Sequence, residues 1–184
     1  MKKLAVLFPG IGYHTDKPLL YYSKKLAAAN NFEVIEVPYG NFPKNIKGSK
    51  EKMKEAFFSA VEQSENILQD INFQQYDKLL FISKSVGTAV AAYYATKHNL
   101  HTYNIFYTPV EDSLAFMEQP GIVFHGTNDD WVDSDMLIAS CKQKGYKVFL
   151  TEKANHSLET DNALTDIKNM QIIMLASEEY IVSI

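Results

Sequence analysis

Residues 78–95, KLLFISKSVGTAVAAYYA, contain the change of pattern that decides the fold of this chain. Residues 79–82 form a short apolar run typical of a buried β-strand, and the small residues from Val86 onward are typical of a slim helix. Ser85 stands between the two. A serine in this place can cap the helix, because its hydroxyl satisfies a free backbone N–H of the first turn. It can equally be a nucleophile at a sharp strand-to-helix turn, and the stretch alone leaves both interpretations open.

Five more short apolar runs predict further strands, because they are rich in β-branched and aromatic residues on both faces. With the first run, the predicted strands cover residues 4–8, 32–37, 79–82, 103–107, 122–124 and 146–150. Helical patterns lie between most of them, and the last is predicted from about Glu159 with Ala163, Ile167, Met170 and Met174 facing inward. Alternating strands and helices indicate right-handed crossovers. We therefore predict a single α/β domain over residues 1–184, a three-layer α/β/α sandwich with a six-stranded, mainly parallel sheet.

Composition excludes several classes of protein. The chain has 184 residues and a formal net charge of −4, which gives no electrostatic case for binding nucleic acid. No apolar stretch approaches the roughly 20 residues of a transmembrane helix, so no membrane association is expected. Cys141 is the one cysteine and cannot form an internal disulfide, which favours a reducing, cytoplasmic compartment.

Three polar residues follow three different predicted strands, at the edge of the sheet where parallel α/β proteins place their chemistry. Ser85 stands in Ser83-Lys84-Ser85-Val86-Gly87, which is the G-x-S-x-G nucleophile pattern with Ser83 at the first glycine. Asp129 follows the strand at 122–124, although its surroundings also read as a simple turn. Asp130 and Asp133 are competing candidates, and Asp133 looks more like the cap of the next helix. His156 follows the strand at 146–150, whereas His125 is expected only to hydrogen-bond its neighbours.

The order Ser85, Asp129, His156 is the chain order of the catalytic triad in α/β-hydrolases, and the sequence resembles that family over nearly its whole length. The resemblance implies a minimal hydrolase fold without an inserted lid, because only about a dozen residues separate the strand that ends at Tyr107 from the next predicted strand. It implies no metal and no organic cofactor.

The resemblance also implies an oxyanion hole made by the backbone N–H groups of Ile11 and Val86, with Gly12 as the alternative first donor. Proline stands at position 9, where the family usually has a histidine. Gly12, Tyr13 and Trp131 are expected to contact the substrate, the two aromatics by lining an apolar pocket. Lys84 is expected to pack its stem on the sheet and keep its charge in water.

The function predicted from these residues is hydrolysis of an acyl bond in a small-molecule substrate, a carboxylic ester or thioester, through an acyl-enzyme on Ser85. Two other interpretations remain open. Ser83, Ser85, Gly87 and Thr88 at a helix N-terminus, with Lys84, would suit a phosphorylated ligand. The same fold could also serve as an interaction module that has lost catalysis.

Overall fold

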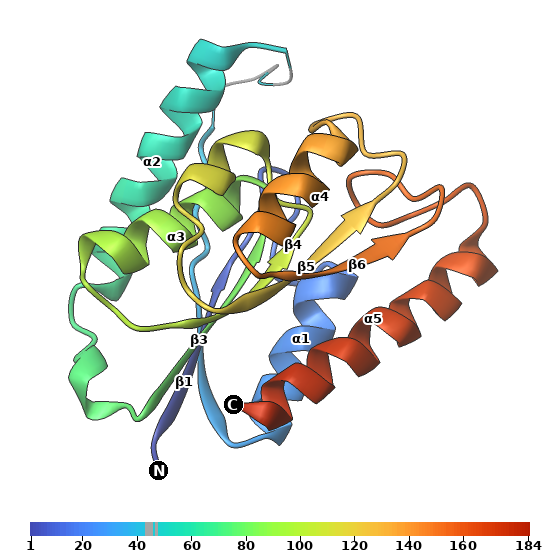
Figure 1. Ribbon diagram of the computed structural model, residues 1–184. Coiled ribbons are helices and arrows are strands. Elements are labelled where there is room, and N and C mark those ends of the chain that lie inside the picture. The colour runs from blue at the N-terminus through green and yellow to red at the C-terminus, as the bar shows by residue number, and fades with distance from the viewer. Residues whose placement is uncertain (43–45, 47) are drawn as a thin grey trace.

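The computed structural model describes residues 1–42, 46 and 48–184. Six strands form one sheet in the order β2-β1-β3-β4-β5-β6, and each neighbouring pair is parallel (Figure 1). The strands are β1 (Lys3–Phe8), β2 (Phe32–Glu36), β3 (Lys78–Lys84), β4 (Tyr103–Tyr107), β5 (Gly121–Gly126) and β6 (Lys147–Thr151). All six were predicted, and their ends differ from the prediction by at most two residues. The largest extensions are at β3 and β5, each by one residue at the start and two at the end. In β3, Ser83 and Lys84 pair with β4 although neither is apolar.

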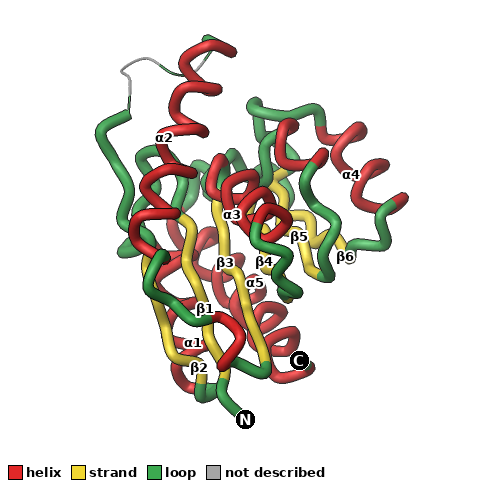
Figure 2. The backbone as a smooth tube through the Cα atoms, turned by 90° about the vertical axis from the view of Figure 1, so that its left-hand side faces the viewer, coloured by secondary structure: helices red, strands yellow, loops and turns green. Residues whose placement is uncertain are grey.

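Helices cover both faces of the sheet, which confirms the predicted three layers (Figures 1 and 2). The helices α1 (Pro18–Ala29) and α5 (Ala163–Ser183) pack on one face and on each other. The other face carries α2 (Lys50–Leu68), α3 (Val86–Lys97) and α4 (Ser134–Gln143). Two short 3₁₀ helices complete the structure, η1 (Phe73–Gln75) and η2 (Glu111–Ala115).

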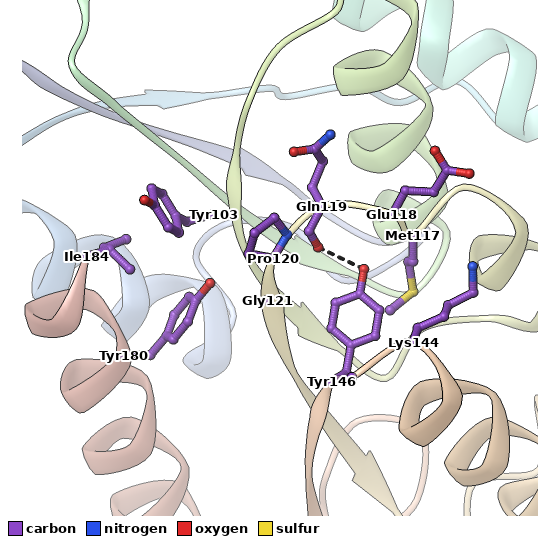
Figure 3. Close-up of a pocket in the computed structure, with 11 residues that line it drawn as sticks. Tyr103, Met117, Glu118, Gln119, Pro120, Gly121, Lys144, Tyr146, Tyr180 and Ile184 are labelled. Atoms are coloured by element: carbon purple, nitrogen blue, oxygen red, sulfur yellow. Dashed lines mark hydrogen bonds between the residues drawn. The ribbon is translucent and has the colours of Figure 1, made fainter.

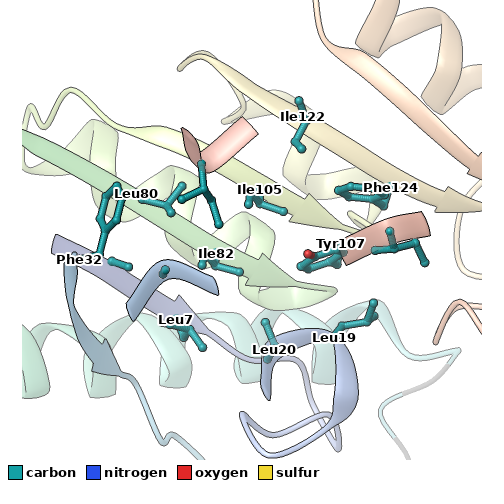
Figure 4. Close-up of a cluster of buried hydrophobic side chains, with 14 of the residues drawn as sticks. Leu7, Leu19, Leu20, Phe32, Leu80, Ile82, Ile105, Tyr107, Ile122 and Phe124 are labelled. Carbon is teal, nitrogen blue, oxygen red and sulfur yellow. The ribbon is translucent and has the colours of Figure 1, made fainter. Parts of the chain in front are cut away.

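Successive side chains of each central strand point to opposite faces, so both layers receive apolar groups. In β3, Leu80 and Ile82 join the cluster under α1 and α5, whereas Leu79 and Phe81 join the cluster under α2 and α3. Figure 4 shows the first cluster, where leucines and isoleucines surround Tyr107. This two-sided burial explains why the strands read as continuous apolar runs.

One buried polar contact ties both helices of that layer to the sheet. The Tyr107 hydroxyl lies 2.8 Å from Ser23 Oγ on α1 and 2.7 Å from Ser177 Oγ on α5. Each serine oxygen also lies 2.7 or 2.8 Å from a carbonyl of its own helix. The three hydroxyl protons can make three of these four contacts hydrogen bonds at any one time, and each buried hydroxyl has a partner. Tyr107 is the last residue of β4, so this contact fixes the strand close to the edge where Ser85 lies.

The inward face predicted for α5 was wrong in part. Ala163 is exposed and Ile167 is 66% exposed. The buried residues are Ile173, Ser177 and Ile181, with Met170 and Met174 packed beside them. The helix also exposes Leu164, Ile172, Leu175 and Val182. Because apolar residues occur around its whole circumference, their spacing alone could not select the face that packs on the sheet.

Cys141 is buried in α4 beside Leu137, and burial raises the pKa of its thiol to about 11. In the described part of the chain, we find no helix with the length and apolar character needed to cross a membrane.

Candidate active site

Ser85 occupies a turn of a single residue between β3 and α3. Its backbone has φ 56° and ψ −128°, a conformation that side-chain-bearing residues rarely adopt and that costs on the order of 1–3 kcal/mol. The turn is held by the Ser85 N–H, which donates to the Tyr107 carbonyl, and by the Ser85 carbonyl, which accepts from Thr88. The Ser85 hydroxyl makes no capping bond to α3. The geometry is that of a nucleophile elbow and does not match a helix cap.

The elbow depends on a close approach at Gly87. A Cβ atom at this position would lie well under 3.0 Å from the carbonyl oxygens of both Phe8 and Pro9. The first turn of α3 can therefore lie against the end of β1 only if residue 87 is glycine. Ser83, at the position of the pattern's first glycine, is fully buried, and its hydroxyl is directed to the Ile105 carbonyl at 3.4 Å.

The structure brings Ser85, His156 and Asp129 together in one chain of hydrogen bonds. Ser85 Oγ lies 2.8 Å from His156 Nε2, and His156 Nδ1 lies 2.8 Å from Asp129 Oδ2. A carboxylate only accepts, so Nδ1 carries the proton and Nε2 is left free to accept one from the serine. Each residue follows a different strand, namely β3, β5 and β6.

Asp129 is buried and its carboxylate is fully engaged. Oδ1 accepts from the Trp131 N–H at 2.9 Å, while Oδ2 accepts from His156. His125, on β5, places Nδ1 3.7 Å from the same Oδ2 and directs Nε2 to Ser134 Oγ at 2.8 Å. As expected, His125 hydrogen-bonds a neighbour, yet it also lies against the carboxylate that orients His156.

His156 is held by its ring and by its backbone. The ring stacks on Trp131 with centroids 5.0 Å apart and an interplanar angle of 21°. The His156 carbonyl accepts from Lys84 Nζ at 2.8 Å and from Thr108 Oγ1 at 3.0 Å. Burial lowers the pKa of His156, and the nearby Lys84 amine acts in the same direction, whereas the hydrogen bond to Asp129 opposes both. The net effect favours the neutral imidazole that a general base requires.

The expectation for Lys84 was wrong. Its side chain is 1% exposed, and Nζ lies 5.0 Å from the centre of the Tyr13 ring instead of reaching water. Residues 80, 82 and 84 of β3 share one face by the period of two, and that face lies under α1 and α5. The turn at Ser85 starts directly after Lys84, so the amine is directed under the loop that carries His156 and not out of the sheet.

The loop after β1 lies directly against Ser85. A Cβ atom on Gly10 would be 3.0 Å from Ser85 Cβ, and Gly10 and Tyr13 exchange two backbone hydrogen bonds that close a tight turn. Ile11 is half-buried and Gly12 is exposed at the tip with φ 73°. Among the described residues we find no acceptor for the N–H groups of Ile11 and Val86. Ile11 lies in the turn that packs on Ser85 and Val86 follows Ser85 directly, and their role as oxyanion donors stays a prediction.

Tyr13 and Trp131 have different surroundings. Tyr13 is buried, and its hydroxyl accepts from the Leu19 N–H at 3.2 Å while its ring faces Lys84. Trp131 borders a cavity of about 550 Å³ that Asp129 also lines. Its other lining residues are mostly acidic: Glu111, Asp129, Asp130, Val132, Asp133, Ser134 and Asp135. Asp133 caps α4 through the Met136 N–H, as expected.

A second cavity, of about 590 Å³, lies at the opposite edge of the sheet (Figure 3). It is bordered by Tyr103 and Gly121, which begin β4 and β5, and by Tyr146 and Tyr180. The Tyr146 hydroxyl donates to the Gln119 carbonyl across it at 2.8 Å. None of the predicted site residues borders this cavity. The described residues also contain no group of three or more histidine, cysteine or acidic side chains suited to a metal ion.

Comparison with solved structures identifies the fold. A protein assigned to the alpha/beta hydrolase superfamily from Xanthomonas campestris pv. campestris matches with a TM-score of 0.73 and 12% identity over 100% of both chains. Est1E from Butyrivibrio proteoclasticus matches at 0.69 with 11% identity, over 99% of this chain and 88% of Est1E. A serine hydrolase without a lid, from Xanthomonas campestris, matches at 0.63 with 12% identity, over 98% and 81%.

The sequence matches no family model and no curated protein. At identities of 11–12%, these matches establish a common fold. The protein therefore has the α/β-hydrolase fold that its sequence predicted. The segment between β4 and β5 contains only η2, so no lid is inserted at that place.

Proposed function

We propose that this protein is a serine hydrolase that cleaves a carboxylic ester or thioester through a covalent acyl-enzyme. The observation that carries the proposal is the unbroken hydrogen-bond chain from Ser85 through His156 to Asp129, with Ser85 in a strained elbow. Ser85 Oγ attacks the acyl carbonyl while His156 Nε2 takes its proton. His156 then protonates the leaving group, and water attacks the acyl-serine with the same imidazole acting as base.

The proposed oxyanion hole consists of the Ile11 and Val86 N–H groups. Val86 begins α3, so its N–H lies at the positive end of the helix dipole. Ile11 belongs to the turn that packs on Ser85 through Gly10. Donors placed here act on negative charge that develops only in the transition state, and one such donor is worth about 3–4 kcal/mol in well-studied enzymes.

The structural neighbours support an acyl substrate. Est1E has been solved with ferulic acid bound, and another neighbour is a serine hydrolase without a lid. The phosphate-binding alternative has weaker support, because the groups that it needs face other partners. Lys84 Nζ is directed to the His156 carbonyl, and Thr88 Oγ1 lies 2.6 Å from both Ser113 Oγ and the Ser85 carbonyl oxygen.

Labelling with a fluorophosphonate probe tests the proposal. We expect the native protein to be labelled at Ser85, located by peptide mass spectrometry, and we expect Ser85→Ala to take up no probe. Ser83→Ala is the matched control, since it removes a hydroxyl only two residues away, near the end of β3, and should still be labelled. A folded native protein that takes up no probe would return the phosphate-binding and interaction-module readings to first place.

The pH at which protonation of His156 halves the rate should be lower than is usual for a histidine-dependent enzyme. Only neutral His156 accepts the serine proton, and burial together with Lys84 lowers its pKa below the ordinary value of about 6.5. The rate of labelling should therefore fall to half its plateau value only at a pH below 6.5, as the imidazole takes up its proton. The rate of labelling measured between pH 4.5 and 8 checks this, and a midpoint above 6.5 would contradict it.

A further inference from the structure

Lys84 connects the segment of Ser85 with the loop of His156 through a buried hydrogen bond. It is the last residue of β3 and the neighbour of Ser85, and its side chain is almost completely buried. Its amine donates to the carbonyl of His156, which is 72 residues further along the chain. A single side chain thus connects the segment that carries the nucleophile with the loop that carries the proposed base.

This amine does not serve an ion pair. No carboxylate lies within 4.0 Å of Lys84 Nζ among the described residues, although Asp129 and Glu159 act on it from farther away. The remaining titratable groups that face it are His156 and the ring of Tyr13. Burial without a close counter-charge lowers the pKa of Lys84 to about 7, so at and below neutral pH the fold carries the cost of a buried charge. Stability alone gives no reason for a lysine here.

The His156 carbonyl has a second donor that acts in the same place. Thr108 follows β4 directly and has φ 42°, and its hydroxyl donates to this oxygen at 3.0 Å. The ends of β3 and β4 therefore hold the backbone of His156, while Asp129 and Trp131 hold its ring. The position of His156 Nε2 depends on the contacts of the backbone as well as on those of the ring, because a shift of the backbone moves the whole imidazole.

We propose that Lys84 is a positioning residue, which fixes the His156 backbone so that Nε2 stays within hydrogen-bond reach of Ser85. This inference rests on the proposed function. A displacement of about 1 Å in a reacting group can cost roughly 100-fold in rate. The buried amine thus supports the reaction although it lowers the stability of the fold.

Lys84→Met tests this, because methionine fills a similar length and has no donor. We expect the rate of fluorophosphonate labelling at Ser85 to fall by roughly 10- to 100-fold. We expect the melting temperature at pH 6–7 to stay unchanged or rise, because a buried charge is removed. We also expect the acid limb of labelling to move to higher pH, because the cation that helps to lower the pKa of His156 is gone.

Lys78→Met is the matched control. Lys78 begins the same strand on the same face, and its amine likewise lies 5.0 Å from a tyrosine ring, that of Tyr103, and 3.3 Å from the Tyr103 hydroxyl. It is remote from the triad, so its loss should leave labelling unchanged. Thr108→Val removes the other donor and should give a smaller loss of rate than Lys84→Met in the same assay.

The outcomes separate this inference from the proposed function. Labelling of Lys84→Met at the native rate would overturn the positioning role and leave the serine hydrolase standing. A Lys84→Met chain that fails to fold would assign the lysine to stability and overturn it as well. A native protein that is not labelled at Ser85 would overturn the proposed function itself.

Discussion

Ser85→Ala and His156→Ala should each lower the hydrolysis of a small chromogenic acyl ester by about 10⁴-fold or more, and the double variant should lose no more than either single one. The two side chains share one hydrogen bond of 2.8 Å and act in one step, in which the hydroxyl is useless without the base and the base without the hydroxyl. Their effects are therefore far from additive. The measurement is kcat/KM for all three variants, with thermal melting to show that each remains folded.

The double variant tests whether Ser85 and His156 act together in one step. If the losses of the two single variants multiply in the double variant, Ser85 and His156 act independently, and the hydrogen bond between them is not the catalytic contact. Residual activity in the Ser85→Ala variant comparable to native would place the reaction elsewhere in the molecule. Ser83→Ala again serves as the control, because it removes a hydroxyl near the end of the same strand and should keep native activity.

The positions of Ser85, Asp129 and His156 could be inferred from the sequence for a simple physical reason. The strands alternate with helices, so their carboxyl ends all meet at one edge, and a polar residue just after a strand must lie near the others. The small residues around Ser85 gave a second indication, because they are needed only where the helix packs closely against the strands. Both features are local in the chain and visible in its periodicity.

The supports of His156 could not be inferred in this way. Lys84 and Thr108 reach its carbonyl from 72 and 48 residues away, and such contacts depend on how three loops fold over the sheet edge. One feature of the sequence could have indicated the burial of Lys84. By the alternation of side chains along a strand, Lys84 shares a face with Leu80 and Ile82, and this strand is buried on both faces. Loop conformation likewise decides that the cavity beside Trp131 is acidic, whereas the sequence had suggested an apolar pocket.

Gly87→Ala should lower the free energy of unfolding by about 3 kcal/mol, the upper end of what overpacking usually costs. The added methyl group would lie well under 3.0 Å from the carbonyl oxygens of Phe8 and Pro9, and neither backbone atom can rotate away as a side chain would. At about 2–4 °C per kcal/mol for a chain of this size, the melting temperature should fall by roughly 10 °C.

Gly40→Ala is the matched control for this change. A Cβ atom on Gly40 meets no other atom within 4 Å, so the same substitution should alter stability by no more than about 0.5 kcal/mol. Accommodation at Gly87 requires α3 to move away from β1, and α3 carries the Val86 N–H beside Ser85. The folded fraction of Gly87→Ala should therefore also label more slowly with fluorophosphonate. Native stability combined with native labelling would show that the approach of α3 to β1 is looser than these contacts require, and the elbow would no longer depend on glycine.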